Sequence, residues 1–421
     1  MNAESILQSY QHFGVHLGLE RTHQLLQKLD NPHQQIPIIH VAGTNGKGSV
    51  CAYLSSVLTE AGYRVGRYTS PHLIDWTERI CINQKPISST QLQQCLERVV
   101  AATENNTETP TQFEIITAAA WLYFAEQKAD IAVIETGLGG RLDATNVCET
   151  PLASVITSIS LEHWQILGPT VADIAGEKAG ILKSKCPAVI GELPESARIV
   201  IEKRIQELDC PATWVKPAVD LGQGFAEYQF NQNADKIKYQ LPLLGKIQLM
   251  NSAIAIATLQ LLQNQGWQIS PTAIENGIAK TQWPGRLQQT TWKNRKILID
   301  GAHNPAAAIA LREYADRLNH HPSPMNWVIG ILATKDCDDI LKALLKKGDR
   351  LYLVPVPDHN SSSPAELAAI AQIICPELTL CQAFPDLTTA LDAAVTGDNL
   401  TILCGSLYLV GYFLQQQQSQ A

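Results

Sequence analysis

The feature that most constrains the fold is an alternation of apolar, strand-length runs with helical segments. Between Ile36 and about Gly191, runs such as IPIIHVAG, ADIAVIETG and LASVITSI are separated by stretches of helical periodicity, the first of them SVCAYLSSVLTEAGY. Unbroken runs of Ile, Val and Ala are typical of parallel strands that helices cover on both faces. This part of the chain is therefore expected to form a mainly parallel α/β sheet.

The segment from Ala212 to Leu244 has a different pattern, because polar and apolar residues alternate in FAEYQFNQNADKIKYQLPLLG. A period of two predicts half-buried antiparallel strands, here a small meander appended to the main sheet. A helix is expected to follow from about Leu249 to Gln265, with Gly266 as its stop.

A second strand–helix series begins after WPGR at residues 283–286, where Pro and Gly interrupt the pattern. We interpret KILIDGAHN, NWVIGIL, RLYLVPV and LTILCG as strands with helices between them. A doubly wound α/β unit of about 135 residues has an ordinary domain size. We therefore predict two domains, residues 1–283 and 287–421, and a frayed polar end after Leu414.

Composition excludes several classes of protein. The 421 residues include 32 Lys and Arg against 40 Asp and Glu, a formal net charge of −8, which disfavours a general nucleic-acid binder. The ten cysteines form no CxxC pair and are expected to be reduced, mostly buried residues of a cytoplasmic protein. No apolar run approaches the ~18 residues of a membrane span, and the N-terminus is too polar for a signal peptide.

The most informative motif is HVAGTNGKGSV at residues 40–50, where an apolar strand runs into a glycine-rich turn and a helical pattern follows. The backbone N–H groups of such a turn, the helix start and Lys47 together favour a bound phosphate. The spacing departs from GxxxxGK[ST], since position 41 is Val and Gly48 separates Lys47 from Ser49. A plain strand–helix turn is the alternative, and the mid-turn lysine favours the phosphate loop.

Three further residues follow strands or lie close behind them. Glu135 ends the strand IAVIE, and a carboxylate at that edge, opposite a phosphate loop, suits Mg²⁺. The alternative is a solvated acid before a glycine turn. His163 follows the strand SVITSI and is a second candidate at the same edge. From the residues alone, Lys178 in EKAGILK is a surface charge on a helix.

The second half carries DGAHNPAA at residues 300–307, again a strand, a glycine turn and a helix start. Asp300 can accept a hydrogen bond from a ribose hydroxyl or a base, and His303 can contact phosphate. Asn304 and Pro305 also suit the N-cap and first position of a helix, so both interpretations hold together. Arg286 of WPGR is either an interdomain salt-bridge residue or an arginine that reaches phosphate.

Together these motifs resemble those of the dihydrofolate synthase/folylpolyglutamate synthase family, within the Mur-type ATP-dependent amide ligases. In the family's order the chain contains LGLER, HVAGTNGKGS, YTSPHL, TERI, FEIITAAA, ETGLGGRLDATNV, EKAGI, WPGR, DGAHNP and GSLYLVG. It departs from the family's pattern at Glu162 before His163, at Asp75-Trp76 before TERI and at Tyr412. The resemblance implies an N-terminal P-loop ATPase domain, a C-terminal Rossmann-like α/β domain and an active site between them.

The resemblance also implies roles for individual residues. The implied catalytic residues are Lys47, His163, Lys178 and Arg286. The implied ATP-binding residues are Thr44, Asn45, Gly46, Lys47, Gly48, Ser49, Asn251, Arg286, Asp300, Gly301, Ala302 and His303. The implied ligands of two Mg²⁺ ions are Ser49, Ser70, Glu135, His163 and Lys178, the last as a carbamylated lysine. The implied contacts of a pterin substrate are Val15, His16, Leu17, Thr111, Gln112, Phe113, Glu114, Leu142, Asp143 and Ala144. A monovalent cation is a further implied cofactor.

The implied activity joins L-glutamate to dihydropteroate, to the γ-carboxylate of folates, or to both, through an acyl phosphate with release of ADP and phosphate. The alternatives are a Mur-type ligase acting on a UDP-linked peptidoglycan precursor, an NTPase without ligation, and a nucleotide-binding scaffold without catalysis. The LGLER and SPHL segments favour folate. We expect a monomer that acts on small molecules, with neither nucleic acid nor membrane as a partner.

Overall fold

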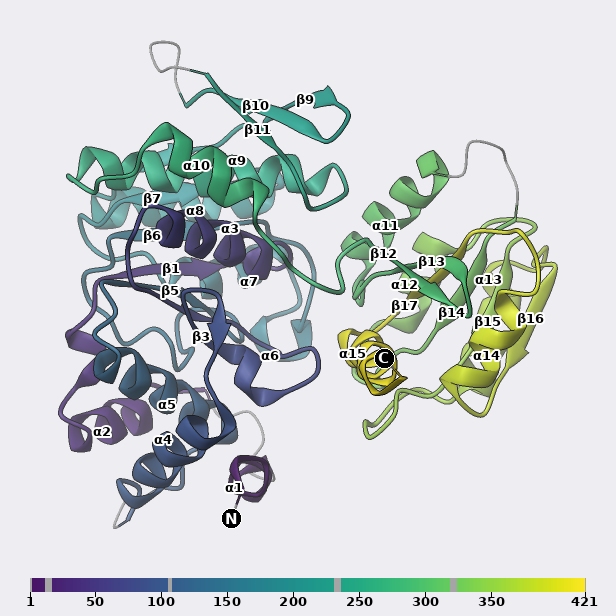
Figure 1. Cartoon of the computed structure of the whole chain (residues 1–421), viewed down its shortest axis with the longest axis horizontal. Coiled ribbons are helices and arrows are strands. Elements are labelled where there is room, and N and C mark those ends of the chain that lie inside the picture. The colour runs from purple at the N-terminus through teal and green to yellow at the C-terminus, as the bar shows by residue number, and fades with distance from the viewer. Residues whose placement is uncertain (1, 12–16, 105–107, 231–235, 319–323, 421) are drawn as a thin grey trace. The chain divides into compact units, whose positions relative to one another are not determined.

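The computed structural model describes residues 2–11, 17–104, 108–230, 236–318 and 324–420. The chain divides into two compact units (Figure 1). Unit 1 contains Met1–Pro242 and Gln248–Gln282, and unit 2 contains Leu243–Ile247 and Trp283–Ala421. The change of unit at Trp283 falls within the WPGR motif.

In unit 1, eight strands form one sheet in the order β4-β3-β2-β5-β1-β6-β7-β8. In chain order these strands are β1 (Ile38–Ala42), β2 (Val65–Tyr68), β3 (Ile80–Ile82), β4 (Lys85–Pro86), β5 (Ile131–Glu135), β6 (Ala153–Ile156), β7 (Ala188–Ile190) and β8 (Ala212–Trp214). All pair in parallel except β3 and β4, an antiparallel hairpin at one edge. Every residue of β1, β5 and β6 is buried, as expected for strands covered on both faces.

The helices of unit 1 cover both faces of this sheet. They are α1 (Ala3–Ser9), α2 (Glu20–Lys28), α3 (Lys47–Glu60), α4 (Ser89–Ala101), α5 (Gln112–Glu126), α6 (Trp164–Leu167), α7 (Val171–Ala179), α8 (Glu195–Leu208), α9 (Ile247–Asn264) and α10 (Pro271–Ala279). Figure 1 shows α3 and α10 on one side of β1 and β5, and α2, α4 and α5 on the other. Capping boxes start α4 at Ser88, α5 at Thr111 and α7 at Thr170.

The predicted antiparallel meander is confirmed, but its start and its attachment were wrong. It is a separate three-stranded sheet of β9 (Val219–Gly222), β10 (Phe225–Tyr228) and β11 (Ile237–Gln240). Ala212–Trp214 instead forms β8, which pairs in parallel with β7 at the edge of the main sheet. Because an edge strand is only partly buried, its sequence carries the same mixed polarity as a meander strand.

The end of α9 follows the sequence prediction closely. Gly266 has φ of 98°, in the left-handed region that glycine adopts readily. Its N–H donates to the Gln263 carbonyl, and the Trp267 N–H donates to the Leu262 carbonyl, both in the Schellman pattern. Gly266 therefore stops the helix by satisfying its last carbonyl groups.

Unit 2 has a six-stranded sheet in the order β12-β13-β17-β14-β15-β16, in which only β12 is antiparallel. Its strands are β12 (Gln288–Trp292), β13 (Arg295–Ile299), β14 (Asn326–Ile329), β15 (Arg350–Leu353), β16 (Leu380–Ala383) and β17 (Thr401–Cys404). Its helices are α11 (Pro305–Leu318), α12 (Cys337–Leu344), α13 (Pro364–Ile374), α14 (Leu387–Ala394) and α15 (Leu407–Gln420). The predicted C-terminal α/β unit is therefore confirmed.

The predicted frayed end after Leu414 was wrong, because α15 continues to Gln420. The helix is nucleated before the polar tail, where Leu409, Val410 and Phe413 are fully buried. Glutamine is a good helix former, so the QQQQSQ tail extends a helix that packing has already fixed.

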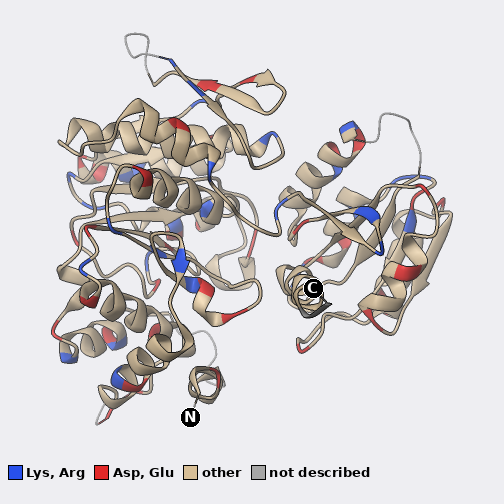
Figure 2. Ribbon diagram, viewed as in Figure 1, with Lys and Arg blue, Asp and Glu red and all other residues tan. Residues whose placement is uncertain are grey.

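The described part of the chain shows how charged residues are distributed, how apolar its helices are and whether its cysteines are paired. Figure 2 shows Lys and Arg interspersed with Asp and Glu along both units. Within the described ranges, no helix is long and apolar enough to cross a membrane. All ten cysteines are free thiols, and six of them are buried.

Candidate active site

The glycine-rich turn after β1 lies at the centre of the main sheet, between the ends of β5 and β6. Val41 pairs with Glu135 and Ala42 pairs with Ile156, so the segments that leave these three strands start side by side. Gly43 has φ of 152°, and a Cβ there would lie 2.0 Å from Thr157 Oγ1. Only glycine fits this approach, which brings the turn against the neighbouring segment.

Residues 157–160 hold the turn in shape. Ser158 Oγ donates to the Asn45 carbonyl at 3.0 Å and accepts from the Asn45 N–H at 3.1 Å. Thr157 Oγ1 donates to the same carbonyl at 2.7 Å, and the Thr44 N–H donates to the Ser158 carbonyl at 2.7 Å. Sequence reasoning missed these hydroxyl groups, although they lie at the carboxyl end of the predicted strand SVITSI, which could have signalled them.

Two lysines share one carbonyl of the turn. Lys47 Nζ donates to the carbonyls of Gly43 at 3.0 Å and Thr44 at 3.1 Å, and Lys178 Nζ donates to the Gly43 carbonyl at 2.8 Å. Lys178 is only 5% exposed, which the sequence did not predict, since a surface position was expected. Burial, with Lys47 as the second cause, lowers the pKa of Lys178 to about 7. The turn is therefore an electropositive site that includes a buried amine of lowered pKa.

Two of the predicted metal ligands lie beside this pair. Glu135 Oε1 is 4.0 Å from Lys47 Nζ, and its Oε2 accepts from the Ser70 N–H at 3.3 Å. His163 is the N-cap residue of α6, with φ of 51°, and its Nε2 lies 4.0 Å from Glu162 Oε1. Over the residues described, no group of three or more His, Cys, Asp or Glu side chains could hold a metal ion. The structure thus brings Ser70, Glu135 and Lys47 together, without such a cluster around His163.

The first turn of α9 packs against the glycine-rich turn. A Cβ on Gly46 would lie 2.4 Å from Asn251 Oδ1, so the predicted ATP-binding Asn251 lies against the start of α3. Asn251 Nδ2 donates to Gln248 Oε1 at 3.0 Å, and Gln248 Nε2 donates to Ser49 Oγ at 3.4 Å. Gln248 was not predicted, because a glutamine near a helix start has no distinctive sequence signal.

The segments predicted to contact the pterin converge in part. A Cβ on Gly137, two residues after Glu135, would lie 2.3 Å from the Phe113 ring. The Gly18 N–H, next to Leu17, donates to the Leu142 carbonyl at 3.5 Å. The structure therefore joins LGLER to the RLDA turn and Phe113 to the segment after β5. Val15 and His16 lie outside the described residues.

Several predicted substrate contacts also have a local structural role. Asp143 is buried, and its carboxylate accepts from the N–H groups of Leu138 at 2.7 Å and Thr145 at 3.0 Å. Burial raises the pKa of Asp143, and these hydrogen bonds oppose the shift. The carboxylate thus shapes the turn on which Leu142 and Ala144 lie.

The start of α5 is similarly fixed. Thr111 Oγ1 accepts from the Glu114 N–H at 3.2 Å, and Glu114 Oε2 accepts from the Thr111 N–H at 2.6 Å. Glu114 also pairs with Arg21 of LGLER at 3.1 Å, and Gln112 Nε2 donates to the Leu7 carbonyl at 2.9 Å. These contacts orient Phe113 between two anchored neighbours.

In unit 2, Asp300 follows β13 and is buried. Its Oδ2 accepts from the Leu287 N–H and its Oδ1 from the Ala302 N–H, both at 2.8 Å. Burial raises the pKa of Asp300, and Arg286 is the largest opposing influence. A Cβ on Gly301 would lie 3.2 Å from an Arg286 Nη atom, so the guanidinium lies against this turn. The structure thus brings Arg286 and the predicted 300–303 turn together.

The remaining residues of that turn lead into α11 and cap its first turn. His303 Nδ1 lies 2.7 Å from the Gly301 carbonyl, which favours Nδ1 as the protonated nitrogen. Asn304 Oδ1 accepts from the Ala307 N–H at 2.9 Å, and Pro305 is the first helical residue. The predicted helix start is therefore confirmed.

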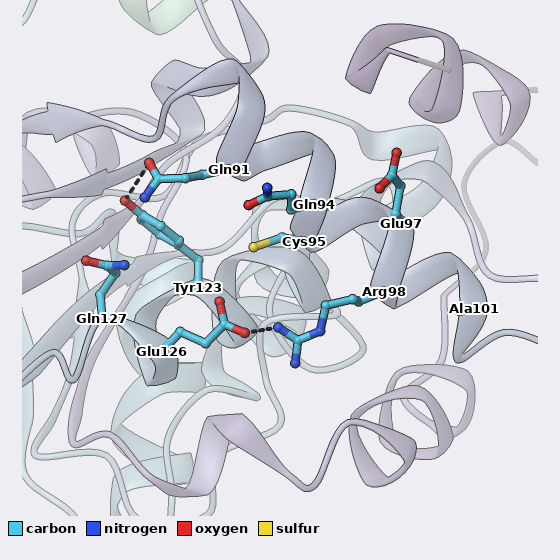
Figure 3. Close-up of a pocket in the computed structure, with 9 residues that line it drawn as sticks. All are labelled: Gln91, Gln94, Cys95, Glu97, Arg98, Ala101, Tyr123, Glu126 and Gln127. Atoms are coloured by element: carbon cyan, nitrogen blue, oxygen red, sulfur yellow. Dashed lines mark hydrogen bonds and ion pairs between the residues drawn. The ribbon is translucent and has the colours of Figure 1, made fainter.

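A pocket of about 520 Å³ lies elsewhere in unit 1, between α4 and α5 (Figure 3). Its charged lining residues are Glu97, Arg98 and Glu126, of which Arg98 and Glu126 form an ion pair, and Tyr123 donates to Gln91. It contains none of the predicted site residues.

Comparison with known proteins identifies the family of the chain. The family model described as the Mur ligase middle domain matches residues 41–259, which include the glycine-rich turn, Glu135, Lys178 and Asn251. The model described as the dihydrofolate synthetase C-terminal domain matches residues 284–416. These matches place the chain among the Mur-type ligases.

Relatives and solved structures narrow the class. The chain is 36% identical over 406 residues to the probable dihydrofolate synthetase of Schizosaccharomyces pombe, covering 94% of this chain and 97% of that protein. It is 34% identical to the dihydrofolate synthase/folylpolyglutamate synthase of Bacillus subtilis, covering 94% of each. The folylpolyglutamate synthase of Mycobacterium tuberculosis, complexed with ADP and AMPPCP, superposes with a TM-score of 0.85 and 28% identity over 99% of both chains. The chain belongs to the dihydrofolate synthase/folylpolyglutamate synthase family, and the predicted resemblance is confirmed.

Proposed function

We propose that this chain is an ATP-dependent ligase that joins L-glutamate to dihydropteroate and to the γ-carboxylate of folates, releasing ADP and phosphate. The observation that carries the proposal is the arrangement at the end of β1 and β5. There Lys47 and Lys178 share the Gly43 carbonyl, and Glu135 lies 4.0 Å from Lys47. The ADP and AMPPCP bound by the M. tuberculosis relative support ATP as the nucleotide.

The residues present fit Mg²⁺ as a cofactor. Ser49, Ser70 and Glu135 offer oxygen donors, and Mg²⁺ takes few protein oxygens while it keeps waters and substrate phosphates. Glu135 is buried, with its carboxylate directed to Ser70 and Lys47. We propose Ser49, Ser70, Glu135, His163 and carbamylated Lys178 as the ligands of two ions. When bound, these ions offset negative charge on the phosphates.

The chain's own groups account for activation of a carboxylate. A carboxylate is a poor electrophile, and transfer of the γ-phosphoryl group makes it an acyl phosphate that the amine of L-glutamate attacks. Lys47 and the N–H groups at the start of α3 offset the charge that spreads over the transferred group. Arg286, Asn251 and residues 300–303 stay predicted ATP-binding residues.

Lys178 has the properties that carbamylation requires. The neutral amine attacks CO₂, forming an N–C bond and releasing one proton, and the product is a carbamate anion. A pKa of about 7 leaves a large neutral fraction at physiological pH, unlike an ordinary lysine. The product would place a carboxylate beside the Lys47 ammonium group.

Two other functions have less support. A Mur-type ligase for a UDP-linked precursor shares the loop chemistry, but the relatives named above are dihydrofolate and folylpolyglutamate synthases. The contacts among Gly18, Phe113, Gly137 and Leu142 support a pterin-binding role for the predicted segments. An NTPase without ligation predicts ADP formation that does not depend on L-glutamate.

One experiment tests the proposal and resolves the substrate. ADP release is measured with dihydropteroate or tetrahydrofolate, each with and without L-glutamate, and with a UDP-linked muramyl substrate as comparison. We expect glutamate-dependent ADP release with both pterin substrates. Release with one alone assigns a single activity, and glutamate-independent release contradicts the ligase proposal.

We also propose a cytoplasmic monomer that acts on small molecules and uses a monovalent cation. The free thiols support a reducing compartment. Light scattering tests the oligomeric state, and replacement of K⁺ by tetramethylammonium tests the cation requirement.

A further inference from the structure

The buried Gln248 of unit 1 is hydrogen-bonded to two of the proposed site residues. It is the second residue of α9, and its side chain is only 3% exposed. Its Oε1 accepts from Asn251 Nδ2 at 3.0 Å, and its Nε2 donates to Ser49 Oγ at 3.4 Å. One side-chain amide therefore joins a proposed nucleotide-binding residue to a proposed metal ligand.

The link spans two helices that are far apart in the sequence. Ser49 lies in the first turn of α3, whose N-cap Gly46 has φ of 88°. Asn251 Oδ1 lies against Gly46, where a Cβ would approach it to 2.4 Å. Since Ser49 and Asn251 are also buried, neither contact is a chance surface encounter.

The chemistry of a hydroxyl ligand explains why such a link matters. A serine hydroxyl rotates freely and has two lone pairs and one proton to place. When an N–H group donates to one lone pair of the serine oxygen, the other lone pair stays available for a cation. The hydroxyl proton then points away from both. A glutamine does this without adding charge, so it does not compete with Lys47 for phosphate or with Mg²⁺ for oxygen.

We propose that Gln248 is a positioning residue, which orients Ser49 for Mg²⁺ in the nucleotide complex. This inference rests on the proposed function, because it requires a magnesium–nucleotide complex at the glycine-rich turn. It predicts that Gln248 strengthens nucleotide binding mainly when Mg²⁺ is present.

The test is equilibrium binding of ADP by calorimetry, with Mg²⁺ or with EDTA, so that no catalytic step contributes. The measured quantity is the factor by which Mg²⁺ tightens ADP binding. We expect Gln248→Met, which keeps length and removes the amide, to reduce this factor about three- to tenfold, as expected for one hydrogen bond. Binding in EDTA should change by less than twofold.

A double-mutant cycle separates orientation of Ser49 from a general packing defect. Ser49→Ala should also reduce the factor, and Gln248→Met should have no further effect in the Ser49→Ala background. Gln260→Met is a matched control on the same helix, because Gln260 Oε1 has no hydrogen-bond partner in the described part of the chain. This control should keep the wild-type factor.

If Gln248→Met does not fold, Gln248→Glu replaces it, since it keeps the acceptor for Asn251 and removes the donor to Ser49. A reduced factor in that variant supports the inference, and an unchanged or larger one overturns it. The inference is also overturned if Gln248→Met reduces the Mg²⁺ factor equally in the wild-type and the Ser49→Ala backgrounds. Wild-type protein that binds no ADP overturns both this inference and the proposed function, whereas magnesium-dependent binding unchanged in Gln248→Met overturns the inference alone.

Discussion

The two units carry the same local motif, a strand followed by a glycine turn and a helix, in different electrostatic surroundings. In unit 1, hydroxyl groups of Thr157 and Ser158 hold the turn, while Lys47 and Lys178 add positive charge. In unit 2, the charged group itself holds the turn, since both oxygens of Asp300 accept backbone N–H groups.

This difference determines whether a charged residue contributes to the activity alone or also to the stability of the turn. Where neutral hydroxyl groups shape the backbone, a charged residue can be removed with little effect on the fold. Where a buried carboxylate shapes the backbone, its removal leaves N–H groups without acceptors and destabilises the turn. Substitution of Lys47 at the turn after β1 is therefore expected to affect activity more than stability, and substitutions at Asp300 to affect both.

The largest expected effect is that of Lys47→Ala. It should lower glutamate-dependent ADP formation by about 10³-fold or more, because it removes the ammonium proposed to offset phosphoryl charge. Arg286→Ala should cost about 10²-fold. Thermal unfolding should change little for Lys47→Ala, as for the surface control Lys280→Ala. Normal turnover by Lys47→Ala would refute the phosphate-loop assignment.

The next effect concerns Lys178. Lys178→Ala should lose most activity, and short carboxylic acids such as acetate should restore part of it, since they supply the missing carboxylate. Rates at increasing acetate concentration measure the rescue, with Lys47→Ala as the variant that acetate should not restore. Absence of a carbamate on wild-type Lys178 after incubation with bicarbonate, by mass spectrometry under native conditions, contradicts this role.

Replacing one glycine in each turn by alanine compares the two turns directly. Gly43→Ala should lower activity about 10²-fold, because its Cβ meets Thr157 Oγ1 at 2.0 Å and its φ is 152°. Gly301→Ala should cost only about tenfold, since its nearest neighbour at 2.3 Å is the end of the Leu407 side chain, which can move. Steady-state rates measure both. Equal losses would show that the two turns are equally constrained.

Asp300→Asn tests the carboxylate that shapes the second turn. The carboxamide keeps one acceptor and presents N–H groups to a backbone N–H, which costs about 1–3 kcal/mol. Hydrogen exchange should rise at residues 284–304, with activity reduced about tenfold. Asp398→Asn, at an exposed side chain of the same unit, is the control. Loss of activity with unchanged exchange would instead indicate direct contact with ATP.

The smallest effect is a pH dependence of stability that distinguishes the units. Burial lowers the pKa of His33 to about 4 and that of His40 to about 3, and both are in unit 1. A lowered histidine pKa gives stability that is complete above pH ~6.5 and is lost as the pH falls towards the folded value, because the unfolded chain binds the proton first.

At pH 5 the loss from His33 alone is about 2 kcal/mol, since each pH unit below ~6.5 contributes about 1.4 kcal/mol. The free energy of opening from hydrogen exchange, corrected for the pH dependence of the intrinsic exchange rate, should therefore fall more in unit 1 than in unit 2 between pH 7 and pH 5. His33→Phe should reduce the difference, because it keeps ring packing against Trp121 and removes the titration. An equal fall in both units contradicts this expectation.

The sequence predicted the elements whose signals are local. Buried strands such as Ile38–Ala42, the helix start at Asn304-Pro305 and the Gly266 stop follow from hydropathy period and turn chemistry. It did not predict β8 or the helical tail, because partner strands and prior packing decide these. The burial of Lys178 and the contact of Gln248 with Ser49 depend on segments far apart in the chain, which no local pattern reports.

The resting contact of Lys47 with the carbonyls of Gly43 and Thr44 has a kinetic consequence. An ammonium group that has internal acceptors is solvated by the protein before the nucleotide arrives and again after it leaves. On the proposed assignment of Lys47 to the nucleotide phosphates, these carbonyls would compete with phosphate for the lysine and weaken ground-state affinity. The same competition would speed the release of ADP and phosphate, so such a loop would favour turnover over tight retention.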